Sequence, residues 1–262
     1  MGMRKFLIKK IAILTIPLVF IFMLAGLTDS DEIQVKNTFP PFAIVELYTS
    51  EGCSSCPPAD RLLSQIVQNA HRQNLPIYTL SFHVDYWNHL GWTDPFSQRK
   101  FSDRQQYYAK INHSTNVYTP QIIINGTHAF NGYRFDLAED IIKQTLKQAA
   151  LIQIHLEIQD QSSNQITFRY DVEGNYKEHV LQVALIERGI VSQVKRGENS
   201  GRTLRHDNVV RVFKTIPLKT HAGTLRLSLP KMIELSNSSI ITYVQNPNTM
   251  LIIGAAAIDL SK

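Results

Sequence analysis

The chemistry of this sequence is concentrated in two cysteines, Cys53 and Cys56, the only cysteines among its 262 residues. They follow directly after the apolar run at residues 42–48, and an amphipathic segment at residues 61–70 comes soon after them. This order predicts a strand, a short loop and a helix, with the cysteines at the helix N-terminus. Backbone N–H groups and the helix dipole stabilise a thiolate there, so we expect the pKa of Cys53, the outer residue, to be lowered. The pattern is that of a redox dithiol in which Cys53 attacks and Cys56 resolves.

Other uses of the cysteine pair stay open at this stage. A structural disulfide over so short a loop removes little entropy from the unfolded chain, although disulfides are common in exported proteins. A structural zinc centre needs about four protein ligands, and the sequence has no second cysteine pair and no His-x-x-x-His pattern, so we predict no metal site. Copper is an alternative, because two thiolates and one of the nine histidines would form a suitable soft ligand set.

The N-terminus has the pattern of a targeting segment. Residues 1–10 carry four basic side chains and no acidic one, and residues 11–27 are apolar apart from Thr15. We therefore predict a signal peptide at residues 1–27, or an uncleaved inner-membrane anchor through residues 11–27, followed by a linker at residues 28–40. Either arrangement predicts an exported protein, periplasmic or secreted, whose dithiol works in an oxidising compartment.

The net charge of +5 belongs largely to this leader, since removing it leaves about +1. We therefore predict no nucleic-acid binding. A local basic stretch does occur at residues 195–211, where glycines and cationic side chains occur together. Its default interpretation is a solvated loop, and the alternative is a site for an anion or a partner, because glycines and arginines together favour an exposed loop with bidentate hydrogen-bond donors. The candidate partner-binding residues are Arg202, Arg205, His206 and Arg211.

The pattern of apolar residues changes near residue 150, which predicts two domains after the leader. Strands and helices alternate over residues 41–150, whereas period-two strands dominate residues 151–262. About seven short strands over roughly 110 residues predict an all-β sandwich domain of immunoglobulin-like architecture. The expected strands lie at residues 151–160, 166–172, 180–186, 209–213, 224–229, 240–245 and 251–258.

The first of these domains carries an insertion. A second apolar strand is expected at residues 76–85, and the inserted segment follows it at residues 86–117. Within the insertion, Asp94 and Pro95 have the residue types of a helix N-cap and of the first helical position. We therefore expect a helix to begin there.

Three linked features resemble proteins of the thioredoxin fold. They are the Cys-x-x-Cys helix start at residues 53–56, the step from Thr119 to Pro120 before an apolar strand, and the Asn-Gly turn at residues 125–126. The resemblance implies a thioredoxin-like domain over residues 41–150. It also implies that Pro120 is cis and lies against the active-site disulfide, with Thr119 offering backbone hydrogen bonds to an extended substrate.

A second resemblance covers nearly the whole chain after the leader. The segments at residues 48–60, 82–87, 90–92 and 201–211 are similar to a family of exported bacterial proteins known only as a domain of unknown function. This resemblance implies a thioredoxin-like domain followed by a β domain. It carries no established activity.

Three polar residues near the dithiol are candidates for moving protons. Glu46 is similar to the buried acid that serves thioredoxins as a proton acceptor, with one extra residue between it and the cysteines here. His83 and Asp85 lie two residues apart at the end of a strand, on one face, where they could tune the thiol or shuttle protons. An equally simple interpretation is that this pair caps and packs the insertion together with neighbouring aromatic residues.

We therefore predict an α/β protein, with a thioredoxin-like domain followed by an all-β sandwich domain, that acts as an exported thiol-disulfide oxidoreductase. Its partners would be thiols or disulfides of other exported proteins, with an unidentified electron donor or acceptor, and an uncleaved N-terminal segment would be its only contact with a membrane. The mechanism needs no cofactor. Two alternatives stay open: a non-catalytic binding module with a permanent disulfide, and a copper-binding thioredoxin-like protein.

Overall fold

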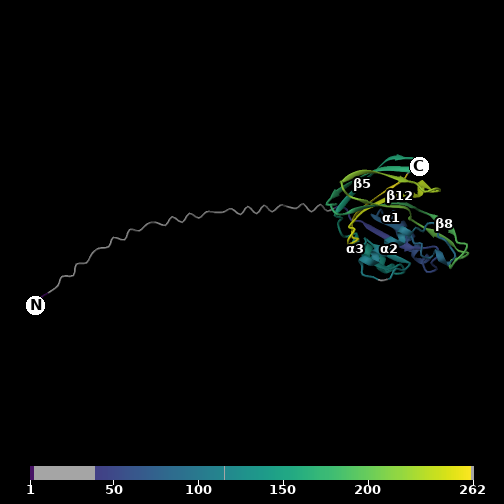
Figure 1. Cartoon of the computed structure of the whole chain (residues 1–262), viewed down its shortest axis with the longest axis horizontal. Coiled ribbons are helices and arrows are strands. Elements are labelled where there is room, and N and C mark those ends of the chain that lie inside the picture. The colour runs from purple at the N-terminus through teal and green to yellow at the C-terminus, as the bar shows by residue number, and fades with distance from the viewer. Residues whose placement is uncertain (3–38, 115, 261–262) are drawn as a thin grey trace. The chain divides into compact units, whose positions relative to one another are not determined.

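Strands dominate this structure, which is a computed structural model describing residues 1–2, 39–114 and 116–260 (Figure 1). The strands of the first half are β1 (Ala43–Thr49), β2 (Ile77–His83), β3 (Gln121–Ile124) and β4 (His128–Asn131). The helices are α1 (Pro57–Gln73), α2 (Arg99–Ile111) and α3 (Phe135–Thr145), with 3-10 turns at η1 (Asn88–Leu90) and η2 (Leu235–Asn237). The strands of the second half are β5 (Ile152–Gln161), β6 (Gln165–Gly174), β7 (Val180–Glu187), β8 (Ile190–Gln193), β9 (Thr203–His206), β10 (Val209–Pro217), β11 (Ala222–Ser228), β12 (Ser238–Gln245) and β13 (Ile252–Asp259). Nearly all of the predicted leader, residues 1–27, lies outside the described residues.

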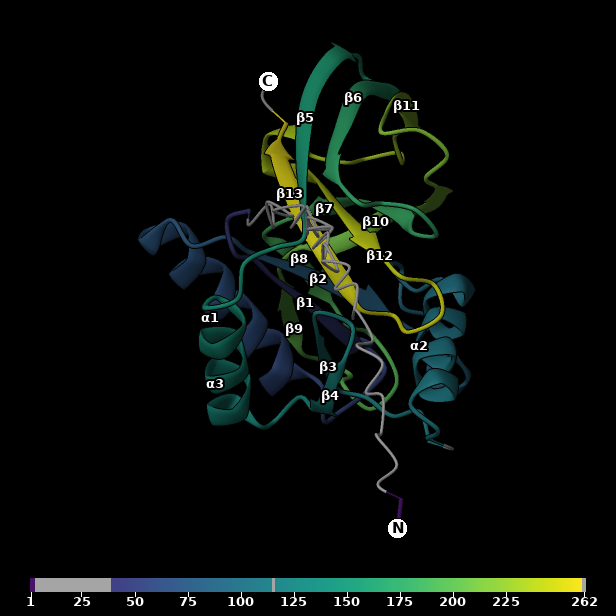
Figure 2. The ribbon, with the colours of Figure 1, turned by 90° about the vertical axis from the view of Figure 1, so that its left-hand side faces the viewer.

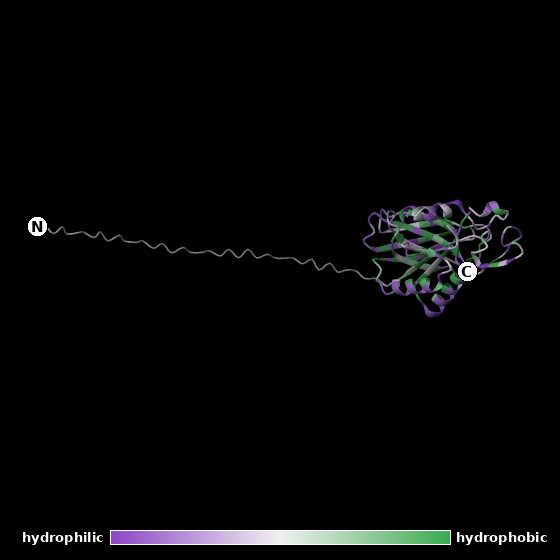
Figure 3. Ribbon diagram, turned by 90° about the horizontal axis from the view of Figure 1, so that it is seen from below, coloured by the Kyte–Doolittle hydropathy of each residue, from purple (hydrophilic) through white to green (hydrophobic). Residues whose placement is uncertain are grey.

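A large mixed sheet organises these elements. Its eight strands have the order β13-β12-β7-β10-β2-β1-β3-β4. A second sheet has the order β11-β6-β5, and β8 pairs with β9 in a short hairpin. Apolar residues are concentrated in the strands, and hydrophilic residues lie mostly in the peripheral helices and loops (Figure 3).

Helices cover both faces of the β1 end of the large sheet (Figure 2). Successive side chains of a strand point to opposite faces, so β1 contributes to two cores. Val45 and Leu47 pack with buried apolar residues of α1 and α3. Ile44 and Tyr48 pack on the other side, in the core that includes residues of α2. Helix α1 packs on the sheet through one face, because its buried apolar residues recur at helical spacing: Ala59, Leu62, Leu63, Ile66 and Ala70.

The two predicted domains share the large sheet, which corrects the predicted boundary near residue 150. Strand β10 lies beside β2 in parallel, with Val209 opposite Ser81. The Asn208 side chain strengthens this junction, because its amide donates to the carbonyl and the hydroxyl of Thr79 at 3.1 and 2.7 Å. Pairing with β10 covers an edge of β2 that would otherwise offer unpaired backbone groups. The described residues from 39 onward accordingly belong to one compact unit.

The predicted β-sandwich is present only in part. Strands β5 and β6 pack apolar residues such as Ile154 and Phe168 against residues of β7 and β12 such as Val183 and Ile240. One layer of this sandwich is therefore the end of the large sheet, so the second half is no separate domain. All seven expected strands occur within a few residues of their predicted bounds, and β8 and β9 were not expected.

The helix predicted to begin at Asp94 begins later. Helix α2 starts at Arg99, with Gln98 as its N-cap. Asp94 instead closes a turn, because its Oδ1 atom accepts the N–H of Phe96 at 2.9 Å. The Asp-Pro pair therefore marks a loop in front of the helix.

Candidate redox site

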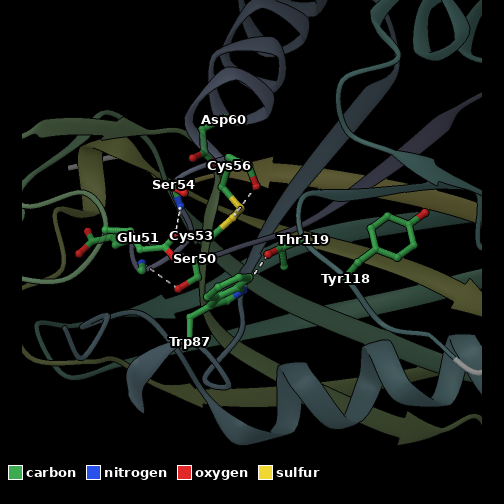
Figure 4. Close-up of a disulfide and its surroundings, with 12 residues drawn as sticks. Ser50, Glu51, Cys53, Ser54, Cys56, Asp60, Trp87, Tyr118 and Thr119 are labelled. Carbon is green, nitrogen blue, oxygen red and sulfur yellow. Dashed lines mark hydrogen bonds between the residues drawn. A yellow bond between two sulfur atoms is a disulfide. The ribbon is translucent and has the colours of Figure 1, made fainter. Parts of the chain in front are cut away.

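The disulfide between Cys53 and Cys56 lies in the loop that connects β1 to α1 (Figure 4). The two Cα atoms are 5.4 Å apart. The Cys53 N–H donates to the carbonyl of Ser50, and the Cys56 N–H donates to the carbonyl of Cys53, so successive turns lead the chain into the helix. Cys56 is the N-cap of α1, and Cys53 lies three residues before it, in the loop. Pro57 and Pro58 suit the first turn, where a backbone N–H has no intrahelical acceptor to lose.

The Thr119-Pro120 peptide bond is cis, and both Pro120 and Ala59 of α1 approach Gly132 closely. Gly132 shows how close this approach is, because a Cβ atom there would lie 2.9 Å from the Cβ atoms of both Pro120 and Ala59. The Thr119 hydroxyl accepts the indole N–H of Trp87 at 2.8 Å. Figure 4 shows Thr119 and Trp87 beside the disulfide.

A loop from the second half of the chain covers the cysteine loop. We call residues 194–202, between β8 and β9, the cover loop. The amide of Asn199, itself fully buried, donates to the carbonyls of Glu51 and Cys53, each at 2.9 Å. Both hydrogen bonds end on the backbone of the turn that carries the disulfide.

Further contacts hold the cover loop in place. The Glu198 carboxylate accepts the N–H of Ser54 at 3.0 Å, and Arg202 donates to the side-chain oxygen of Asn199 at 2.9 Å. Neither cysteine has any exposed surface in this arrangement. A reagent in solution therefore cannot reach either sulfur in this conformation.

Five ionisable side chains are buried together beside the cysteine loop, and we call them the acid-histidine cluster. They are Glu51, Asp60, His83, Asp94 and His206, each at most 5% exposed. The His206 ring lies between two carboxylates, with Nε2 3.5 Å from Oε1 of Glu51 and Nδ1 3.8 Å from Oδ2 of Asp60. His83 Nδ1 lies 2.7 Å from Oδ2 of Asp94. The two imidazole rings meet edge to face at 4.9 Å, so the cluster is continuous.

Burial and neighbouring charges shift the pKa of three members of the cluster, Asp60, His83 and Asp94. Burial raises the pKa of Asp60, an effect that His206 and His83 only partly oppose. Burial by itself would lower the pKa of His83, but the Asp94 carboxylate outweighs it and the pKa is raised. For Asp94, burial would raise the pKa, and His83 together with two backbone hydrogen bonds lowers it instead.

Several polar atoms of the acid-histidine cluster have no hydrogen-bond partner among the described residues. They are Oε1 of Glu51, Oδ1 of Asp60, Nε2 of His83 and both ring nitrogens of His206. Unpaired buried polar groups cost stability. The cluster is therefore a poor means of stabilising the fold, and a chemical role would account for it better.

The predicted pair of His83 and Asp85 is not a pair in the structure. The Asp85 carboxylate accepts the hydroxyl of Ser102 in α2, and the Asp85 N–H donates to the same hydroxyl at 3.1 Å. His83 pairs with Asp94 instead. The alternative interpretation, packing of the insertion, therefore describes Asp85, whereas His83 belongs to the acid-histidine cluster.

Glu46 lies on the face of β1 that points towards α2. Its carboxylate accepts Arg104 Nη2 at 2.6 Å and the hydroxyl of Tyr243 at 2.6 Å. Arg104 also donates to Gln245 at 3.1 Å, and its pKa is raised because Glu46 and nearby tyrosines outweigh the effect of burial. Glu46 therefore forms a buried ion pair with Arg104, and their contacts join α2 to β1 and β12.

The four basic candidates for partner binding do not form one surface. Arg202 and Arg205 are exposed, whereas His206 is buried in the acid-histidine cluster. Arg211 pairs with Glu187 and lies over the ring of Phe96. The basic stretch therefore faces inward as well as outward.

Sequence reasoning missed the residues that surround the disulfide most closely. Glu51, Asp60 and Asn199 are all buried there. Asp60 follows Cys56 by four residues, a spacing that places both on one helix face and could have drawn attention to it. Asn199 has no such local signal, because its position depends on the fold of the β8–β9 hairpin.

The described residues contain neither a ready-made metal site nor a helix that could span a membrane. No group of three or more histidine, cysteine, aspartate or glutamate side chains there has a geometry that could hold a metal ion. No helix in that part of the chain is both long enough and apolar enough for a membrane span. That the reduced cysteines bind no metal stays a prediction, and copper binding stays the alternative.

Comparison with known proteins gives a family and a fold. A crystal structure of a protein from Agrobacterium tumefaciens is 27% identical and covers 82% of this chain and 93% of that chain, with a TM-score of 0.62. A crystal structure of an outer membrane lipoprotein domain from Porphyromonas gingivalis is 16% identical, covers 43% of this chain and 89% of that chain, and has a TM-score of only 0.25. No curated protein matches. The family model described as protein of unknown function (DUF1223) matches residues 44–245, and this chain belongs to that family.

Proposed function

We propose that this protein is a thiol-disulfide oxidoreductase with a thioredoxin-like active site. The observation that carries the proposal is that the Cys53-Cys56 pair directly precedes α1, with Cys56 as the N-cap, and that Thr119 lies beside the disulfide (Figure 4). A helix N-terminus stabilises a thiolate, which is the reactive form in disulfide exchange. Thr119 lies beside that pair (Figure 4), and an extended substrate segment would lie along its backbone.

The proposed reaction proceeds through a mixed disulfide. In the reduced protein, the Cys53 thiolate attacks one sulfur of a substrate disulfide, and the other substrate sulfur leaves as a thiolate. The Cys56 thiolate then attacks Cys53, which releases the second substrate thiolate and closes the Cys53-Cys56 disulfide. The substrate gains two electrons, and the dithiol loses two. Run backwards, the same steps oxidise a substrate dithiol.

The cover loop adds a condition to this reaction. Both sulfurs are fully buried, and Asn199 holds the backbone of the cysteine loop, so in this proposal the substrate meets a form in which the cover loop has moved away. Movement frees the carbonyls of Glu51 and Cys53, which are then available to substrate N–H groups. The proposed substrates are thiols or disulfides of other exported proteins, and the proposed location is the periplasm or the exterior.

Trapping of the mixed disulfide tests the function. The reduced Cys56→Ser protein is mixed with oxidised glutathione, quenched with acid and analysed by mass spectrometry. We expect one glutathione, bound to Cys53, because the variant lacks the resolving thiol. Wild type should retain almost none, and Cys53→Ser should react more slowly. A Cys56→Ser protein without adduct, or a faster-reacting Cys53→Ser protein, would contradict the proposal.

A second function is favoured by the same burial of both sulfurs. A binding module with a permanent disulfide needs no access to Cys53 or Cys56. In that case the folded protein should resist reduction by dithiothreitol until it unfolds globally. A reduction rate that matches the measured global unfolding rate would favour this second function over the first.

A further inference from the structure

The acid-histidine cluster is larger than a structural role requires. Its five side chains come from the cysteine loop, α1, β2, β9 and the loop before α2, and all are buried. The His206 ring faces a carboxylate on each side, at 3.5 and 3.8 Å, and it can pass a proton from one to the other when these distances shorten to hydrogen-bond length.

Helix geometry connects this cluster to the dithiol. Cys56 already has helical backbone angles, and the Asp60 N–H donates to the Cys56 carbonyl at 3.1 Å. Side chains four residues apart on a helix are neighbours, with Cβ atoms roughly 5–6 Å apart. Both side chains are buried, and Figure 4 shows Asp60 beside Cys56. Oδ1 of Asp60 has no hydrogen-bond partner among the described residues, so it is available to a thiol.

We propose that Asp60 is the proton acceptor for Cys56, and that His206 and Glu51 position it and exchange its proton. This inference rests on the proposed function. In the mixed disulfide, the Cys56 thiol gives its proton to the Asp60 carboxylate and attacks Cys53. The bond between Cys53 and the substrate sulfur breaks, and the substrate thiolate takes up one proton as Asp60 releases one. Electrons and protons balance, with a disulfide and a dithiol on each side.

The surroundings of Asp60 favour this role over that of Glu46. His206 faces Asp60 from β9, and Glu51 faces His206 from the cysteine loop. The His83 ring, which pairs with Asp94, meets the His206 ring edge to face. Burial raises the pKa of Asp60, which makes its carboxylate a stronger base near neutral pH. Glu46 is held by Arg104 on the opposite face of β1, so its carboxylate is already committed.

The test separates attack by Cys53 from resolution by Cys56. The reduced protein is mixed rapidly with the aromatic disulfide dithiobis(nitrobenzoate), whose coloured thiolate leaves once when Cys53 attacks and once when Cys56 resolves. A thiol with a pKa of about 8.5 is only about 3% ionised at pH 7, so loss of its base should slow resolution roughly 30-fold there. We therefore expect Asp60→Asn to slow the second release roughly 30-fold near neutral pH and to leave the first unchanged. Its second release should recover to the wild-type rate above about pH 9, where the thiol ionises unaided.

Controls keep the result specific. Asp103→Asn removes an exposed carboxylate of α2 and should change neither phase. His206→Gln should also slow the second thiolate release, but by a smaller factor than Asp60→Asn. This variant provides the test if Asp60→Asn fails to fold. A second phase at the wild-type rate in both variants, or a loss that does not recover at high pH, would overturn the role of Asp60. A wild-type protein that releases no second thiolate would instead refute the proposed function itself.

Discussion

The cover loop offers the sharpest test of how the disulfide is reached. In Asn199→Ala, the two hydrogen bonds to the carbonyls of Glu51 and Cys53 are lost, each of which is 2.9 Å long in the native protein. A hydrogen bond contributes about 0.5–1.5 kcal/mol, so the closed form should lose about 1–3 kcal/mol relative to the open form. Since about 1.4 kcal/mol corresponds to a factor of ten, the open population should rise about 5- to 140-fold.

The assay is the rate at which a small phosphine reduces the Cys53-Cys56 disulfide in the folded protein, under conditions where opening is faster than reduction. The rate is then proportional to the open population, and we expect Asn199→Ala to raise it at least about fivefold. Asn248→Ala, at an exposed position of another loop, is the matched control. Urea unfolding of both variants shows whether a faster reduction exceeds the change in global unfolding. A rate within twofold of wild type, or an equal rise in Asn248→Ala, would refute the idea that the cover loop limits access.

Two further predictions concern the ionisable groups. The raised pKa of His83 means that its charged form stabilises the fold at pH values below about 6.5, and that this stability is lost as pH rises through the folded value. The free energy of unfolding from urea titrations should therefore fall as pH rises above about 6.5, and His83→Gln should flatten this fall; an unchanged slope would count against the pairing with Asp94. Glu46→Gln should cost about 3–5 kcal/mol of unfolding free energy, because it leaves Arg104 buried without its partner. The same substitution should not slow the second thiolate release, whereas a slowing that recovers at high pH would return Glu46 to the redox site.

Much of the first half of the fold can be predicted because its signals are local. The apolar run before the cysteines, the prolines after them and the amphipathic spacing of Leu62, Leu63 and Ile66 determine a strand, a loop and a helix within about 30 residues. Strand positions in the second half follow from period-two alternation. Which strands pair cannot be read in this way, because the contact of β10 with β2 depends on one register pair and on the side chain of Asn208.

Some residues of the candidate site also have local sequence signals, whereas others are brought there only by tertiary packing. Cys53, Cys56 and Pro120 carry motif signals, and the structure places them at one helix end. His206 lies in a stretch whose glycines and arginines indicate an exposed loop, and only tertiary packing shows that its ring is buried between two carboxylates. The alternation along β1 separates Glu46 from its neighbours, but both faces of this strand are buried, so the sequence does not tell which face meets the dithiol.

The cysteines are synthesised well before the cover loop. Asn199 and His206 are synthesised about 150 residues after Cys56, and at roughly 5–20 residues per second this interval lasts about 8–30 s. Throughout that time the newly made cysteines have no cover, so any enzyme or small oxidant nearby can join or exchange them. Once the β8–β9 hairpin has folded, the same sulfurs react only when the cover loop opens. A new molecule can therefore be oxidised or reduced faster before this hairpin folds than afterwards.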